Sequence, residues 1–174
     1  MTDHNTQAPR ALVVDDDRLV RLIVAQTLLA AGFVVDEGDC GAAALRLVQN
    51  VPDVLVIDVN LPDVSGLTVC RAVRISEKTA DIGVVFLTGD DDVRTVVTAF
   101  AAGADDCLHK PIVGEVFVAR VQRAVAHAAD RKAARRGQQQ HEVIVRFLGD
   151  LEAATTSAPV RESANKLRAL IDKR

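Results

Sequence analysis

Residues 54–66, VLVIDVNLPDVSG, join an apolar run, a carboxylate and a turn in one short stretch. The run Val54–Ile57 consists of Val, Leu and Ile, and a continuous run of this kind is typical of a strand buried on both faces of a parallel sheet. Asp58 follows it directly, and the turn LPDVSG leads into a segment with helical spacing. The stretch therefore predicts a strand, a loop and a helix, with a carboxylate at the carboxyl end of the strand.

The same alternation of a short apolar run and a helical segment recurs along the chain. The predicted strands are Ala11–Val14, Phe33–Val35, Val54–Ile57, Val84–Leu87 and Cys107–Leu108, the last assigned mainly from its position. The predicted helices are Leu19–Ala30, Ala42–Val48, Val64–Ile75, Val93–Ala102 and Val113–Ala128. Five such repeats predict an α/β fold with a doubly wound, five-stranded parallel sheet. Folds of this class bind ligands at the carboxyl ends of their strands.

Two segments flank this predicted domain, which we place at residues 10–128. The polar residues 1–9 are expected to be a disordered tail, and residues 129–174 a helical extension. The charged stretch 129–137 is interpreted as a boundary or as a continuation of the preceding helix. Beyond it, apolar stripes predict two short helices in an antiparallel hairpin, at Gln139–Ala153 and Val160–Asp172. Such stripes require a partner surface, so we expect them to pack on the domain, on a second copy in a homodimer, or on another protein.

Composition and charge make a nucleic-acid surface unlikely. The 174 residues include five Phe and neither Trp nor Tyr, whereas base stacking needs exposed rings. Residues 1–129 contain 11 Lys and Arg against 18 Asp and Glu, a net charge of −7, and residues 130–174 contain 10 against 6, a net charge of +4. The basic run at residues 131–136 is expected to be a solvated helix face.

The cysteines and the apolar segments bear on the cellular compartment. Cys40, Cys70 and Cys107 form no CxxC pair and have no His at ligand spacing, which favours a reducing compartment over a disulfide framework or a zinc site. The N-terminal residues lack the apolar run of a signal peptide. No stretch reaches the roughly 18 apolar residues that span a bilayer. We therefore expect a cytoplasmic protein without a membrane partner.

Polar residues follow four of the predicted strands and should meet at one edge of a parallel sheet. They are the acidic residues 15–17, Asp58, Thr88 and Lys110. Clustered carboxylates repel one another, and Mg²⁺, which prefers oxygen ligands, removes the conflict. Mg²⁺ and Lys110 could together neutralise an incoming phosphoryl group, with Thr88 donating a hydrogen bond to it. The pattern predicts a site for phosphoryl transfer.

Four motifs resemble the receiver domain of two-component response regulators, which has a flavodoxin-like βα5 fold. They are ALVVDDD at residues 11–17, VLVIDVNLPDVSG at 54–66, VVFLTG at 84–89 and GADDCLHKP at 103–111, in the order and spacing of that family. The resemblance covers about residues 10–128. It implies that Asp58 is the phosphoacceptor. It also implies that Mg²⁺ is held by Asp15, Asp16, Asp58 and the backbone carbonyl of Asn60.

The resemblance assigns further roles around the acidic cluster. Thr88 would be the switch hydroxyl, Gly89 would leave the site open to a phosphodonor and water, and Lys110 would contact the phosphoryl group. The peptide before Pro111 would be cis. Where the family usually has Tyr or Phe, this chain has Cys107, interpreted as a small buried apolar residue rather than a redox sensor. The aromatic half of the family's switch is therefore missing, and the switch is expected to be muted or built differently.

Three functional hypotheses remain open at this point. The first is a signalling switch that accepts a phosphoryl group from a sensor histidine kinase or a phosphotransfer protein and then alters its binding to an output protein. The second is a binding module that works without phosphorylation. The third is a DNA-binding regulator that acts through residues 130–174. We do not expect an enzyme acting on external substrates, because a magnesium-dependent phosphatase would need a separate general acid near Asp58.

Overall fold

The computed structural model describes residues 8–89, 93–112 and 114–154. The chain divides into two units, Met1–Asp130 and Arg131–Arg174. The predicted tail at residues 1–9 lies outside the described residues except for its last two positions, and the predicted helix Val160–Asp172 lies wholly outside them.

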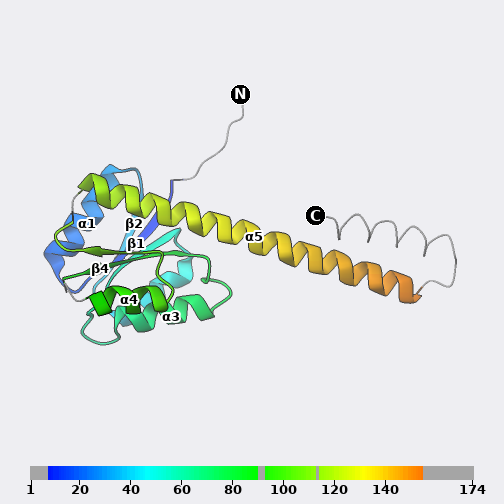
Figure 1. Ribbon diagram of the computed structural model, residues 1–174. Coiled ribbons are helices and arrows are strands. Elements are labelled where there is room, and N and C mark those ends of the chain that lie inside the picture. Colours follow the sequence, from blue (N-terminus) through cyan, green and yellow to red (C-terminus); the bar gives the residue numbers. More distant parts are fainter. Residues whose placement is uncertain (1–7, 90–92, 113, 155–174) are drawn as a thin grey trace, which may run out of the picture. The chain divides into compact units, whose positions relative to one another are not determined.

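The first unit is built on a five-stranded sheet in the order β2-β1-β3-β4-β5, in which every neighbouring pair is parallel. The strands are β1 (Arg10–Val14), β2 (Val34–Gly38), β3 (Val54–Asp58), β4 (Gly83–Thr88) and β5 (Asp106–His109). The helices are α1 (Arg18–Ala30), α2 (Gly41–Leu47), α3 (Gly66–Ile75), α4 (Val93–Ala101) and α5 (Gly114–Ala154), with a 3₁₀ turn, η1, at Val48–Asn50 (Figure 1). This architecture confirms the predicted doubly wound sheet.

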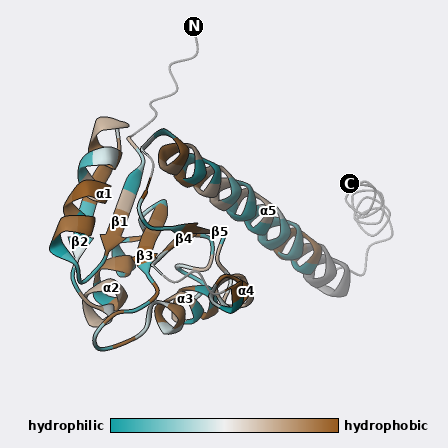
Figure 2. Cartoon of the chain, turned by 60° about the vertical axis from the view of Figure 1, so that its left-hand side comes forward, coloured by the Kyte–Doolittle hydropathy of each residue, from teal (hydrophilic) through white to brown (hydrophobic). Residues whose placement is uncertain are grey.

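Apolar layers cover both faces of the sheet, which explains why its inner strands are continuously apolar. Alternate residues of a strand point to opposite faces, so Leu55 packs in the layer that contains α3 and α4, and Val56 in the layer that contains α1 and the start of α5. Figure 2 shows β1, β3 and β4 as largely hydrophobic strands between the helices. The central strand β3, which ends at Asp58, is buried throughout.

The edge strands depart most from their predicted bounds. β2 continues past the predicted Phe33–Val35 through Asp36 and Glu37. As an edge strand it pairs with β1 alone, and the half-buried Asp36 and the exposed Glu37 show that its positions accept polar side chains. α3 begins at Gly66 rather than at the predicted Val64, because Ser65 caps it: its side chain accepts a hydrogen bond from the Thr68 N–H.

Helix α5 is longer than predicted. It runs from Gly114 to Ala154 as one helix of 41 residues, so the predicted helix Val113–Ala128 does not end at Ala128. The charged stretch 129–137 is a continuation of that helix, and the predicted helix Gln139–Ala153 is its C-terminal part rather than a separate element. Ala, Arg, Lys and Gln are strong helix formers, and the single Gly137 weakens a helix by only about 1 kcal/mol. No helix in the described ranges is both long and apolar enough to cross a membrane.

Gly66 offers a test of how tightly α3 packs behind the end of β3. A Cβ at this first residue of α3 would collide with the Asp58 carbonyl oxygen and approach the Phe86 ring to 3.1 Å. We expect Gly66→Ala to lower the free energy of unfolding by about 1–3 kcal/mol, as overpacking does. Gly114 is the first residue of α5, and a Cβ there meets nothing within 4 Å, so Gly114→Ala is the matched control. Denaturant unfolding gives both values; equal stabilities of the two variants would show that the contact at Gly66 is not tight.

Candidate functional site

Polar residues from four strands meet at the carboxyl edge of the sheet. Asp15 follows β1, Asp58 ends β3, Thr88 ends β4 and Lys110 follows β5. The register brings them level, because Val14 pairs with Ile57 and the neighbouring strands continue that alignment across β4 and β5. The convergence expected from a parallel sheet is therefore present.

Lys110 joins two buried carboxylates. Its Nζ lies 2.6 Å from Asp58 Oδ1 and 2.7 Å from Asp15 Oδ2. Asp15 is fully buried and Asp58 is 5% exposed. The contact of Lys110 with Asp58 is a hydrogen bond, whereas its contact with Asp15 Oδ2 is an ion pair only. Both carboxylates thus face the same point in space, where one positive charge now lies.

The electrostatics of this cluster favour a further positive charge. Burial raises the pKa of the Asp58 carboxyl above its ordinary value, and the charge of Lys110 together with the Asn60 N–H offsets this only in part. Burial alone would lower the pKa of Lys110, but Asp15 and Asp58 outweigh it and raise that pKa. Lys110 therefore stays protonated, and two buried acids share one cation.

The loop after Asp58 is held close to the carboxylate. The Asn60 N–H donates to Asp58 Oδ2 at 2.6 Å, and the Val59 N–H donates to the Leu87 carbonyl at 3.2 Å. The Gly66 N–H closes the loop by donating to the Val59 carbonyl at 3.0 Å. The backbone of Asn60 is thereby fixed beside the acidic cluster.

The three consecutive acids after β1 take different positions. Asp15 contacts Lys110, Asp16 is exposed, and Asp17 caps α1 by accepting hydrogen bonds from the Leu19 and Val20 N–H groups. Within the described ranges, no three or more His, Cys, Asp or Glu side chains form a metal-binding group. Mg²⁺, however, is usually held by one or two carboxylates and completed by water. The facing oxygens of Asp15 and Asp58 are a donor pair of that kind, so the chemistry of the site fits a hard divalent cation.

The remaining predicted site residues lie on β4 and β5 or directly after these strands. Thr88 is buried at the end of β4, and Gly89 after it is exposed, with open space where a Cβ would lie. Cys107 is half-buried on β5 and packs against the apolar layer that contains α3 and α4. Burial raises the pKa of its thiol, and the charge of Asp106 adds to this, so the thiol stays neutral. Cys107 is half-buried rather than buried as predicted. The Lys110–Pro111 peptide is cis, as the resemblance implied.

Sequence reasoning missed two features on the β5 side. The buried carboxylate of Asp106 is bound by Arg120 at 3.0 Å and by Arg123 at 2.8 Å, which ties β5 to α5. The only sequence signal was a pair of arginines three residues apart on one helix.

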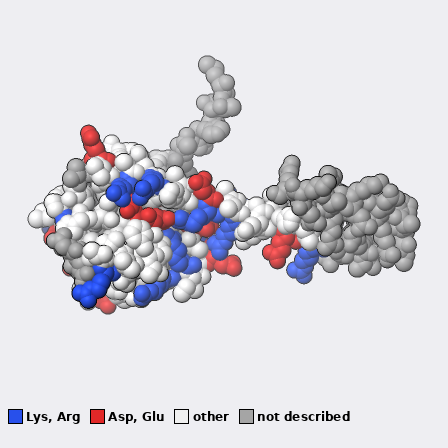
Figure 3. All heavy atoms as spheres, viewed as in Figure 1, with Lys and Arg blue, Asp and Glu red and all other residues white. Residues whose placement is uncertain are grey.

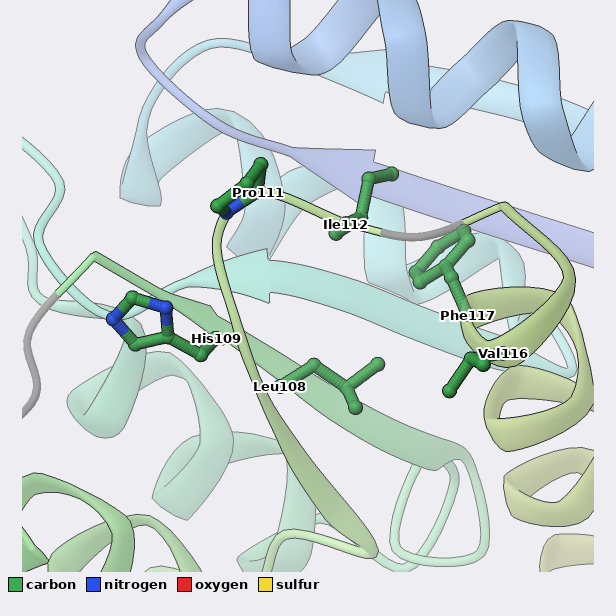
Figure 4. Close-up of a pocket in the computed structure, with 6 residues that line it drawn as sticks. All are labelled: Leu108, His109, Pro111, Ile112, Val116 and Phe117. Carbon is green, nitrogen blue, oxygen red and sulfur yellow. The ribbon is translucent and has the colours of Figure 1, made fainter.

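A cavity of about 140 Å³ also lies where β5 leads into α5 (Figure 4). It is lined by Leu108, His109, Pro111, Ile112, Val116 and Phe117.

Comparisons with known proteins agree with this geometry. Residues 11–122 match the response regulator receiver domain family. The DNA-binding dual master transcriptional regulator RpaA of Synechocystis is 40% identical over 124 residues, which are 71% of this chain and 51% of that protein. The chain spans about half the length of the curated relatives it matches.

Solved structures with the same fold include receiver domains from several bacteria. A putative response regulator from Chloroflexus aurantiacus is 35% identical with a TM-score of 0.67, and the match covers 69% of this chain and 99% of that one. The receiver domain of the sensor histidine kinase PA1611 from Pseudomonas aeruginosa, solved with a magnesium ion in its active-site cleft, has a TM-score of 0.64 at 22% identity, covering 69% and 99%. The family match spans the five strands of the sheet apart from Arg10 at the start of β1, and this protein therefore belongs to the response regulator receiver domain family.

Proposed function

We propose that this receiver domain accepts a phosphoryl group on Asp58 from a sensor histidine kinase or a phosphotransfer protein, in a reaction that needs Mg²⁺. The observation that supports this best is the contact of Lys110 Nζ with Asp58 Oδ1 at 2.6 Å, beside the second carboxylate of Asp15. Asp58 ends the central strand of the sheet and is positioned by the Asn60 N–H. A receiver domain is typically not an enzyme with external substrates.

Each side chain has a distinct task in this proposal. An Asp58 carboxylate oxygen attacks phosphorus, and its bond to phosphorus forms as the phosphorus–nitrogen bond of a donor phosphohistidine breaks. Lys110 then lies beside the transferred group and neutralises part of its charge. The Thr88 hydroxyl donates a hydrogen bond to a phosphoryl oxygen, and the open space at Gly89 admits the donor and, later, water. Phosphoryl transfer needs this positioning and charge stabilisation above all.

Mg²⁺ would be held by Asp15, Asp16, Asp58 and the backbone carbonyl of Asn60. When bound, the ion supplies positive charge that the phosphoryl oxygens need during transfer. The Asp15 and Asp58 oxygens that both contact Lys110 support this assignment, and Asp16, the next residue after Asp15, is exposed. We take Asp16 as a direct ligand and Asp15 as acting partly through water. The magnesium ion in the Pseudomonas receiver domain is further support.

We infer that the output is a change in protein–protein interaction rather than contact with DNA. Helix α4 exposes Val93, Val97 and Phe100, at 73%, 61% and 48% of their surface, and exposed apolar patches mark binding surfaces. On the face of the first unit shown in Figure 3, basic and acidic side chains lie next to one another and form no continuous basic stripe. Cys107, which lacks the ring of an aromatic switch, keeps a phosphorylation-independent binding module as the second candidate.

Phosphorylation of the intact chain tests the first candidate. After incubation with Mg²⁺ and acetyl phosphate, we expect mass spectrometry to show the gain of one phosphoryl group by the wild type and no gain by Asp58→Asn. Asp53 precedes the same strand at its opposite end and accepts a hydrogen bond from the Arg10 N–H. Asp53→Asn is therefore the matched control and should be phosphorylated like the wild type. The assignment is wrong if Asp58→Asn gains the group with unchanged stoichiometry.

Thermal melting tests the metal site. Because Mg²⁺ binds only the folded chain, a concentration tenfold above its Kd should stabilise the protein by about 1.4 kcal/mol and raise the Tm by about 4 °C. Asp16→Ala should remove this shift. Asp17→Ala should keep the shift while lowering stability in the absence of Mg²⁺ by about 1 kcal/mol, because Asp17 caps α1. A midpoint that millimolar Mg²⁺ leaves unchanged in the wild type would contradict the proposed site.

A further inference from the structure

The loop that follows Asp58 is bound to the start of helix α2 through Asp63. Asp63 Oδ1 accepts a hydrogen bond from the Gly41 N–H at 2.7 Å, and Oδ2 accepts one from the Ala42 N–H at 2.8 Å. These two groups belong to the first turn of α2. Cys40, in the N-cap position, makes no side-chain capping bond there. The Asp63 side chain therefore caps the start of α2 in place of the N-cap residue, although it is 22 positions away from Gly41.

Two further observations concern this junction, the first its packing and the second the charge of Asp63. A Cβ at Gly41 would collide with the Val64 carbonyl oxygen and lie 2.7 Å from the Val64 Cβ, so the helix start and the loop pack without room for a side chain. The hydrogen bonds from Ala42, Val64 and Gly41 also hold the pKa of Asp63 below its ordinary value. Asp63 is accordingly charged at neutral pH and accepts both bonds as a carboxylate.

The same loop carries the predicted backbone ligand of the metal. At its beginning, the Asn60 N–H is bound to Asp58 Oδ2, and at its end the Gly66 N–H is bound to the Val59 carbonyl. Asp63 lies three positions after Asn60 and fixes the middle of the loop on α2. The Asn60 carbonyl lies between these two backbone hydrogen bonds. If Asp63 lost its hydrogen bonds to α2, this part of the loop would no longer be supported by the helix.

We propose that Asp63 is a positioning residue of the phosphoacceptor site, which holds the Val59–Ser65 loop on α2 and thereby keeps the Asn60 carbonyl in place for Mg²⁺. This inference rests on the proposed function, because it takes the Asn60 carbonyl as a metal ligand. When a group that orients a metal ligand is lost, the affinity of the site for the metal typically falls by about 10–100-fold. Asp63 acts through the loop and does not touch the reacting atoms.

Calorimetric titration with Mg²⁺ tests this role, at a temperature well below the Tm so that all variants are folded. We expect Asp63→Ala to weaken Mg²⁺ binding about tenfold, the lower end of the range for lost ligand support. Asp63→Asn retains one carbonyl oxygen as a hydrogen-bond acceptor, so its Mg²⁺ affinity should lie between those of Asp63→Ala and the wild type.

A second variant separates positioning of the loop from capping of α2. Ser at an N-cap can accept a hydrogen bond from the first turn of a helix, so Cys40→Ser supplies a local cap where Cys40 makes none. In the double variant Cys40→Ser/Asp63→Ala, we expect the Tm to recover toward the wild-type value while Mg²⁺ affinity stays weak. Recovery of the affinity together with the Tm would show that Asp63 is only a helix cap and would overturn the proposal.

Two other outcomes distinguish this inference from the proposed function. If the wild type binds Mg²⁺ and Asp63→Ala binds it equally well, the positioning role is overturned and the proposed function stands. If the wild type binds no Mg²⁺, the metal-dependent function is itself contradicted, and the role of Asp63 falls with it.

Discussion

The ion pairs of Lys110 with two buried carboxylates are the interactions on which the rest of the site depends. Buried charges are tolerated only when they are paired, and Asp15 and Asp58 reach the same ammonium within 2.7 and 2.6 Å. The three side chains come from β1, β3 and the end of β5, which lie far apart in the sequence. A parallel sheet brings them together because all its strands end at one edge. One cation for two acids leaves the cluster suited to a second cation.

Much of this arrangement could be predicted from the sequence, since it follows from local patterns. The apolar runs predicted the inner strands, and the polar residues that follow four of the runs predicted which side chains converge, because strand ends must meet in a parallel sheet. Edge strands were harder, as the half-buried Asp36 and the exposed Glu37 in β2 show, because such positions do not require apolar residues. The continuation of α5 through residues 129–137 was only one of two alternatives, because a charged stretch of good helix formers does not signal whether a helix ends. The contacts of Asp63 with α2 and of Asp106 with α5 join residues that are separated in the sequence, so no periodic pattern of residues predicts them.

These two missed contacts support the site from opposite sides. On one side, Asp63 binds the loop after β3 to α2. On the other, Asp106 binds β5, the strand that leads to Lys110, to Arg120 and Arg123 of α5. Both hold the elements that carry the site in a fixed position, and both use side chains outside it.

The most direct test of the account is chemical identification of the phosphorylated residue. Borohydride reduces an aspartyl phosphate to homoserine, so reduction of the phosphorylated chain followed by peptide sequencing by mass spectrometry marks the position that carried the group. We expect homoserine at position 58 alone, and only after incubation with Mg²⁺ and a phosphodonor. Homoserine at position 15, 16 or another carboxylate, or an unmodified Asp58 in a chain that has gained phosphate, would contradict it.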